Sequence, residues 1–186
     1  MRVGIEKSRN LMTARLAMTI GMDRVQDYAK RFGLNDDLPP FLSMSLGAGE
    51  TTLLRLTSAY GMLVNGGRKI TPSLIDRIQD RHGKTIYRHD ARDCSSCVAA
   101  DGWSNQPIPT LPDTREQLTD PASAFQMVSM LEGVIKRGTG RSINALNLAV
   151  AGKTGTTNDN TNGWFIGFTP DLAIGVFIGY DRPRPL

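Results

Sequence analysis

The residues most capable of chemistry lie in one glycine- and threonine-rich string near the end of the chain, Ala151-Gly152-Lys153-Thr154-Gly155-Thr156-Thr157. A lysine ammonium beside threonine hydroxyls can bind a substrate carboxylate, and a glycine among them lets a substrate backbone lie against the strand. The main-chain N–H of Thr156 would form half of an oxyanion hole. On the edge strand of a sheet, Lys-Thr-Gly is typical of enzymes that transfer acyl groups through a nucleophilic serine.

A phosphate-binding loop competes for the same string, because that motif also ends in glycine, lysine and a hydroxyl residue. The motif requires a glycine five residues before Gly152, and this chain has Asn147 there. A helix must also begin directly after the motif so that its N-terminus faces the phosphates, whereas Gly155 and a run of Thr, Asn and Asp follow here. The string therefore favours acyl transfer over phosphate binding.

A second candidate element opens the chain, where Ser8 and Asn10 flank Arg9. In serine acyl transfer, a Ser-x-Asn element supplies a hydroxyl that relays a proton to the leaving group and an amide that holds a substrate carbonyl. A structural interpretation competes, because Asn10 would also serve as the N-cap of the first predicted helix. The order of the two elements and their separation along the chain favour the catalytic interpretation.

Regular elements must bring these two short strings together. Apolar residues at helical spacing predict helices over residues 10–20, 23–32, 51–64 and 121–137. The last helix is marked by Asp120 as N-cap and Pro121 at the first helical position, and Phe125 is expected on its apolar face. Strands are then predicted over residues 148–156, 163–168 and 172–180, with connections short enough for an antiparallel meander. Helices followed by such a sheet indicate the α+β class.

The stretch from residue 68 to residue 119 has a different character. Two short strands joined by Arg81-His82-Gly83 predict a hairpin within it. Residues 90–119 then show little periodicity and hold prolines and both cysteines, so we expect an irregular inserted subdomain on the surface.

Several strings along the chain resemble one protein family. They are Glu6-Lys7-Ser8-Arg9-Asn10, Leu46-Gly47-Ala48-Gly49-Glu50, Ala59-Tyr60 through Asn65-Gly66-Gly67, Arg137-Gly138-Thr139-Gly140, residues 152–157 and residues 163–170. Together they resemble the transpeptidase domain of class A penicillin-binding proteins, over essentially the whole chain except residues 90–119. The resemblance implies an N-terminally truncated penicillin-binding protein/serine β-lactamase-like fold, with helices packed on an antiparallel sheet. Residues 1–186 would be the C-terminal part of that domain.

The same resemblance implies a function and a set of site residues. The family's bifunctional enzymes polymerise peptidoglycan through an upstream glycosyltransferase and cross-link stem peptides through a serine acyl-enzyme, which β-lactams form by mimicking D-Ala-D-Ala. Stem peptides and β-lactams are thus the expected partners, at the periplasmic face of a Gram-negative inner membrane, with the membrane anchor outside this chain. The motif matches carry over as catalytic residues Ser8, Asn10 and Lys153 and as substrate-binding residues Thr154, Gly155, Thr156 and Thr157.

The chain departs from the family at its first motif, Ser-x-x-Lys, which holds the nucleophile. None of the six lysines has a serine three residues before it. We therefore expect the nucleophile to lie outside these residues and the isolated chain to be inactive. We also expect it to self-associate through core surface that missing elements would leave exposed.

Composition limits the remaining partners. A net charge of +4 over 186 residues is too small to argue for nucleic acid, and the longest nearly apolar run, Leu172–Gly179, is far shorter than a membrane span. No pattern predicts a cofactor or a metal. For Cys94 and Cys97, a periplasmic location favours a local disulfide over free thiols and over a zinc site shared with His82 and His89.

Two rival functions stay open at this point. A serine β-lactamase would use a Glu-x-x-Leu-Asn element to position water, and Glu50 and Leu53 match it while Leu54 replaces the asparagine. A non-catalytic penicillin-binding-like interaction module is the second rival.

Overall fold

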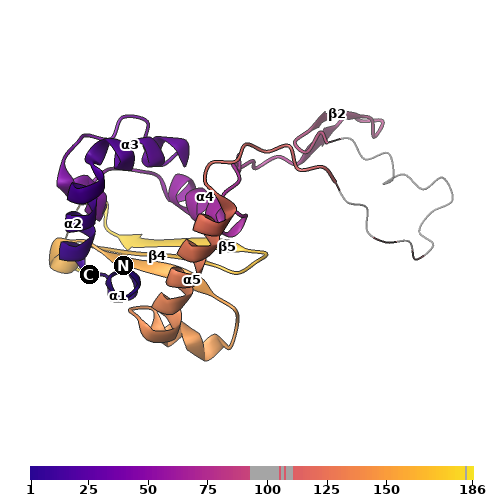
Figure 1. Cartoon of the computed structure of the whole chain (residues 1–186). Helices are drawn as coiled ribbons and strands as arrows, with labels where there is room; N and C mark the ends of the chain where they lie inside the picture. The colour runs from indigo at the N-terminus through magenta and orange to yellow at the C-terminus, as the bar shows by residue number, and fades with distance from the viewer. Residues whose placement is uncertain (93–104, 106, 108–110, 183) are drawn as a thin grey trace. The chain divides into compact units, whose positions relative to one another are not determined.

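The computed structural model describes residues 1–92, 105, 107, 111–182 and 184–186 (Figure 1). It divides into two compact units, one formed by Met1–Ile70 with Glu116–Leu186 and the other by Thr71–Arg115. All the predicted catalytic and substrate-binding residues belong to the first unit. Within the described part of the chain, no helix has both the length and the apolar character needed to cross a bilayer.

The first unit is built from helices and one sheet. Its α-helices are α1 (Arg2–Glu6), α2 (Asn10–Ile20), α3 (Met22–Arg31), α4 (Leu53–Val64) and α5 (Pro121–Arg137), and its 3-10 helices are η1 (Leu42–Leu46), η3 (Arg141–Leu146) and η4 (Asn158–Asn160). Helix α5 begins as predicted, with the Asp120 carboxylate accepting the Ser123 N–H at 2.9 Å and Pro121 opening the helix. Helix α1 was not predicted from the sequence.

The sheet contains β3 (Ala151–Thr156), β4 (Asn162–Phe168) and β5 (Ala173–Gly179) in the order β3-β4-β5 (Figure 1). Every neighbouring pair is antiparallel, which confirms the predicted meander, although β3 begins three residues later than expected. Gly175 lets α4 pack closely on β5, because a Cβ there would lie 2.0 Å from the Thr57 Oγ1. Helices on an antiparallel sheet confirm the α+β class.

Two apolar clusters hold the helices on one another and on the sheet. Phe32, Ala59, Met62 and Leu118 form the first. The second, Leu131, Ala151 and Phe168, joins α5 to β3 and β4, with Tyr60 packed against it and its ring 6.2 Å from that of Phe168. Burial raises the pKa of Tyr60 to about 12. Phe125 was expected on the apolar face of α5, but it is 71% exposed there, so that expectation is wrong.

The second unit holds a β-hairpin between β1 (Arg77–Gln79) and β2 (Thr85–Arg88). In its turn the Asp80 carboxylate accepts the N–H groups of His82 and Lys84, at 2.8 and 2.9 Å, and Gly83 adopts a positive φ of 81°. Cys94 and Cys97, on which the disulfide and zinc interpretations depend, lie outside the described residues.

Candidate active site

Ser8 is placed by the way in which α1 ends. The N–H of Ser8 donates to the Ile5 carbonyl at 3.2 Å, and the N–H of Arg9 donates to the Gly4 carbonyl at 2.8 Å. These two bonds form a Schellman motif, in which the residue after the C-cap takes the left-handed conformation and is usually glycine. Ser8 occupies that position with a φ of 51°. A serine there costs about 1–2 kcal/mol relative to ordinary helical backbone, so surrounding contacts must hold it.

Lys153 brings the two predicted motifs into contact. Its Nζ donates to the Ser8 Oγ at 2.8 Å, although the two residues are 145 positions apart in the chain, and also donates to the Thr154 carbonyl at 2.8 Å. The lysine is half-buried, and its desolvation lowers its pKa. A lysine with a lowered pKa exchanges its proton more readily near neutral pH, as a proton relay with a serine hydroxyl requires.

Asn10 is the first residue of α2, and Arg9 is the N-cap, with no capping side-chain hydrogen bond. The structural role predicted for Asn10, an N-cap, is therefore wrong. The backbone geometry explains the difference: Arg9 already has the extended conformation, φ −85° and ψ 100°, from which the helix starts. Asn10 is exposed, and the described residues provide no hydrogen-bond partner for its amide. Its side chain is thus accessible to solvent.

The threonines of the C-terminal motif have three different environments. The Thr154 hydroxyl lies 2.6 Å from the Thr139 hydroxyl. Thr156 is exposed at the end of β3. The Thr157 hydroxyl lies 2.8 Å from the Thr161 hydroxyl and accepts the Asn162 N–H at 2.8 Å, so it stabilises the turn into β4.

Thr139 is a candidate site residue that the motif reasoning missed. It follows the end of α5, and its hydroxyl contacts the motif strand through Thr154. The only sequence signal for it was its position in the string Arg137–Gly140, which carried no assigned role.

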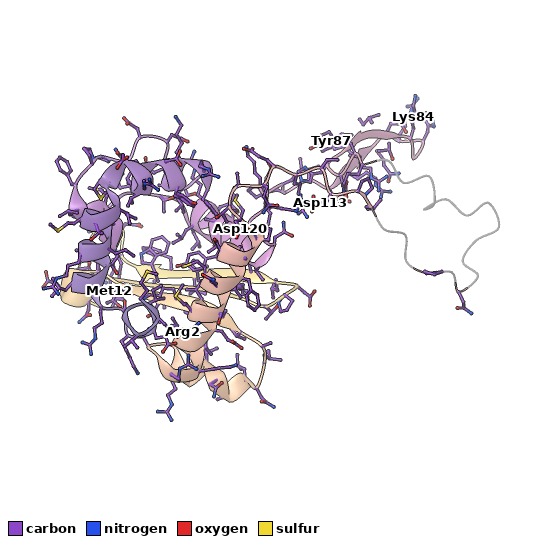
Figure 2. The ribbon with its side chains drawn as sticks, viewed as in Figure 1. Arg2, Met12, Lys84, Tyr87, Asp113 and Asp120 are labelled. Carbon is purple, nitrogen blue, oxygen red and sulfur yellow. The ribbon has the colours of Figure 1, made fainter. Side chains whose placement is uncertain are left out.

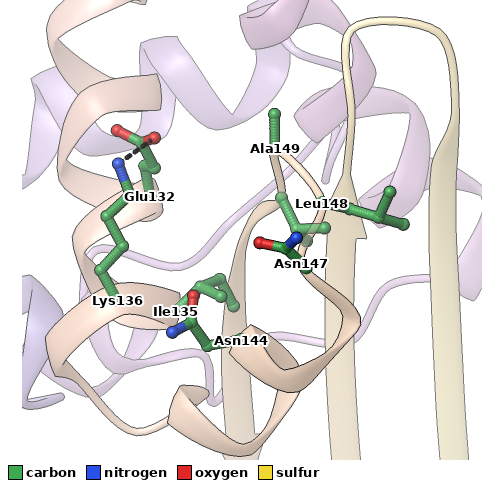
Figure 3. A pocket seen from close by; sticks show the side chains of 8 residues that line it. Glu132, Ile135, Lys136, Asn144, Asn147, Leu148 and Ala149 are labelled. Carbon is green, nitrogen blue, oxygen red and sulfur yellow. Dashed lines mark ion pairs between the residues drawn. The ribbon is translucent and has the colours of Figure 1, made fainter.

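A pocket among the described residues lies elsewhere. It is lined by residues of α5 and of the segment from η3 to β3 (Figure 3). Its volume is about 330 Å³. Glu132, Lys136, Asn144 and Asn147 supply its polar lining, and none of the predicted site residues takes part. The Ser8–Lys153 contact, rather than this pocket, is therefore the candidate active site.

Comparison with known proteins identifies the family of the chain. A family model described as the penicillin binding protein transpeptidase domain matches residues 1–180. The chain belongs to this transpeptidase family.

Its curated relatives include penicillin-binding proteins 1A. That of Rickettsia bellii is 47% identical over 187 residues, and that of Neisseria lactamica is 38% identical over 188 residues. Both alignments take in 100% of this chain but only 24% and 21% of the relatives. Among solved structures, penicillin-binding protein 1A from Haemophilus influenzae superposes with a TM-score of 0.79 at 28% identity, over 97% of this chain and 30% of that one.

Proposed function

We propose that this chain forms the C-terminal part of a serine D,D-transpeptidase domain and contributes two of its three motifs to peptidoglycan cross-linking. The observation that carries the proposal is the 2.8 Å contact between the Lys153 ammonium and the Ser8 hydroxyl, which joins the two motifs across 145 residues. Membership of the transpeptidase family and the similarity to penicillin-binding proteins 1A support it. We place the intact enzyme at the periplasmic face of the Gram-negative inner membrane, with a glycosyltransferase upstream.

In the proposed reaction a serine from outside this chain attacks the carbonyl of the penultimate D-alanine of a stem peptide. The proton released by the attacking serine passes through Lys153 and Ser8 to the amine of the terminal D-alanine, which leaves as the acyl-enzyme forms. An amine of a neighbouring stem peptide then resolves the acyl-enzyme. The hydroxyls of Thr154 and Thr156 would bind the substrate carboxylate, and the Asn10 amide would hold a peptide carbonyl. Penicillin-binding protein A from Mycobacterium tuberculosis, a fold relative, is described as an imipenem acyl-enzyme complex.

The ladder between β3 and β4 supports the oxyanion role of Thr156. The Thr157 N–H donates to the Asn162 carbonyl at 3.2 Å, so this pair is a hydrogen-bonded one. Because hydrogen-bonded and non-bonded pairs alternate in an antiparallel ladder, the Thr156 N–H faces away from β4. Strand β3 is an edge of the described sheet, which leaves that N–H to a substrate.

A hybrid protein tests this proposal. In it, this chain replaces the aligned segment of the Rickettsia bellii relative, and all other residues come from that relative. We expect a fluorescent penicillin to label the hybrid covalently and to leave the 186-residue chain unlabelled, as read on a denaturing gel. Lys153→Ala should slow labelling of the hybrid by about 100-fold or more. The matched control, Lys136→Ala, removes an exposed lysine of α5 and should label like the parent hybrid.

Other outcomes decide against parts of the proposal. A labelled band from the 186-residue chain alone means that a nucleophile lies within it. Rapid release of hydrolysed penicillin by the hybrid favours the β-lactamase rival. A folded hybrid without any label favours the non-catalytic module.

We also propose that the isolated chain self-associates through the outer face of β5. Ile174, Val176 and Ile178 share this face and are 50%, 43% and 58% exposed, while Gly175 faces α4. We expect sedimentation velocity to show dimers or larger species, and Val176→Lys to return the chain to monomer. Leu74→Lys, at a 98% exposed position of the second unit, is the control. A monodisperse wild-type monomer would contradict the proposal.

A further inference from the structure

Glu6 is a buried charge for which the proposed reaction has no use. Its side chain is 6% exposed, and its carboxylate accepts two hydrogen bonds from the Arg137 guanidinium, at 2.5 Å from Nη2 and 3.4 Å from Nε. Hydrogen bonding from Arg137 lowers the pKa of Glu6, so the carboxylate is charged at neutral pH. Gly133 of α5 makes room for it, because a Cβ there would lie 2.1 Å from the Glu6 Oε1.

The same contact zone fixes the main chain of α1 against the end of α5. The Thr139 N–H donates to the Glu6 carbonyl at 3.2 Å, and the Lys7 ammonium donates to the Arg137 carbonyl. Gly138 permits this approach, since a Cβ there would lie 2.2 Å from the Glu6 carbonyl oxygen.

The other end of α1 is held on α5 in the same way. There the Arg2 guanidinium donates to the Ser129 carbonyl at 3.1 Å. Figure 2 labels Arg2. Two separate polar attachments, together with the packing of Ile5 against the second apolar cluster, therefore hold this five-residue helix in place.

The contacts between the end of α1 and the end of α5 connect the two motifs. Ser8 follows Glu6 by two residues, in a left-handed conformation that only surrounding contacts can maintain. On the other side, the Thr139 hydroxyl contacts Thr154 at 2.6 Å. A displacement of α1 would therefore move Ser8 relative to Lys153, whereas β3 would keep Lys153 in place.

We propose that Glu6 is a positioning residue of the active site, which acts through Arg137 to hold the Ser8 hydroxyl opposite the Lys153 ammonium. Its part in the reaction rests on the proposed function, but its effect on geometry does not. An uncharged side chain at position 6 would lose the paired hydrogen bonds and leave the close approach to α5 without its main attraction. The Ser8–Lys153 contact should then lengthen or break.

The geometric part is tested on the 186-residue chain by measuring the titration of the Lys153 side chain by NMR. Ser8→Ala removes a hydrogen-bond acceptor from the Lys153 ammonium and should lower its pKa. Glu6→Gln should lower it in the same direction, and adding Ser8→Ala to Glu6→Gln should produce no further shift. Independent, additive shifts would mean that Glu6 acts on Lys153 only through its charge, and would overturn the proposal. So would an unshifted Lys153 in Glu6→Gln.

Glu132→Gln is the matched control for this titration. Glu132, on α5, also forms an ion pair, with the Lys136 Nζ at 2.6 Å. This pair is exposed, and it is distant in sequence from both motifs. The control removes the same charge and should leave the Lys153 titration at its wild-type position. If Glu6→Gln does not fold, Arg137→Lys keeps the charge and loses the guanidinium fork, and should produce a smaller shift of the same sign.

The catalytic part is tested on the hybrid. Glu6→Gln should slow fluorescent penicillin labelling by about 10- to 100-fold, while Glu132→Gln should label like the parent hybrid and Glu6→Asp should recover part of the rate. Equal labelling rates for Glu6→Gln and the parent would overturn the positioning role. An unlabelled parent hybrid is instead a failure of the proposed function, and the Lys153 titration then decides the proposal alone.

Discussion

Ser8 and Lys153 meet at 2.8 Å, but the two halves of the candidate site are held by different kinds of structure. Lys153 stands in the middle of a strand, opposite buried Ile166 in a three-stranded sheet. Ser8 follows a five-residue helix, a length that has little stability of its own in water. The strand half therefore depends on the apolar core. The Ser8 half has only Ile5 packed against that core and depends otherwise on polar tertiary contacts with α5. One motif should therefore survive damage that displaces the other.

The largest expected effect concerns the strand half. Phe168 is 3% exposed in the cluster that joins α5 to the sheet, so Phe168→Ala should lower the free energy of unfolding by about 3–5 kcal/mol. Phe125→Ala makes the same change at a 71% exposed position and should stay within about 0.5 kcal/mol of wild type. Urea unfolding followed by circular dichroism compares the two. Equal losses would mean that β3 is not held by this core.

A smaller effect is expected where α1 meets α5. A Cβ at Gly138 would lie 2.2 Å from the Glu6 carbonyl oxygen, a main-chain atom that cannot turn aside. Gly138→Ala should therefore lower the free energy of unfolding by about 1–3 kcal/mol. In the control Gly163→Ala the nearest atom to the new Cβ is the Leu186 Cδ1 at 3.8 Å, an ordinary contact. The same urea titration should show little change for the control, and a wild-type midpoint for Gly138→Ala would contradict the close approach.

Ser8 itself provides a third contrast, because the backbone strain and the hydroxyl can be separated. Ser8→Gly should unfold with a free energy about 1–2 kcal/mol higher than that of Ser8→Ala, since glycine adopts a φ of 51° without a steric penalty. Both variants lose the hydroxyl, so neither hybrid should label with fluorescent penicillin at the parent rate. Equal stabilities for the glycine and alanine variants would show that Ser8 is not strained.

The smallest effect, a pH dependence of stability, arises from Glu6. Its folded pKa lies below the ordinary value of about 4.5, because Arg137, Arg2 and Lys7 surround the carboxylate. A lowered carboxyl pKa contributes stability that is fully present above pH 4.5 and is lost as the pH falls through the folded pKa. As the pH is lowered from about 6 to about 3, the melting temperature should therefore fall more steeply for the wild-type chain than for Glu6→Gln. Parallel curves would mean that the ion pair does not stabilise the fold.

Much of the strand half could be predicted from the sequence because its signals are local. Three successive predicted strands with short connections were enough to predict the meander, and Asp120 with Pro121 marked the start of α5. The Lys-Thr-Gly string was enough to predict the chemistry of this half, because a strand presents consecutive residues at a fixed spacing. The expectation for Phe125 was wrong, because the helical spacing of an apolar residue does not show whether another element covers it.

For the Ser8 half, the motif could be predicted from the sequence, but the backbone turn and the contacts that hold it could not. Helix α1 has too few residues for periodicity to detect, so the Schellman turn that holds Ser8 left no signal. Thr139 and Arg137 lie more than 125 residues from α1, and their contacts with Glu6 and Lys7 depend on how α5 packs. The N-cap role predicted for Asn10 was wrong. Asparagine favours helix starts in general, but the extended backbone of Arg9 makes Arg9 the N-cap here.

The amino-acid sequence alone determined the family, the fold class and the chemistry of the two motifs, including the absence of a Ser-x-x-Lys element from these residues. These properties depend on residue types and short spacings, which need no knowledge of distant contacts. The tertiary structure decided that Lys153 reaches Ser8, that Thr139 joins Thr154, and that the Glu6–Arg137 pair supports the end of α1. Each of these contacts joins segments whose approach is set by packing of the core, and by glycines such as Gly133 and Gly138 where no side chain would fit.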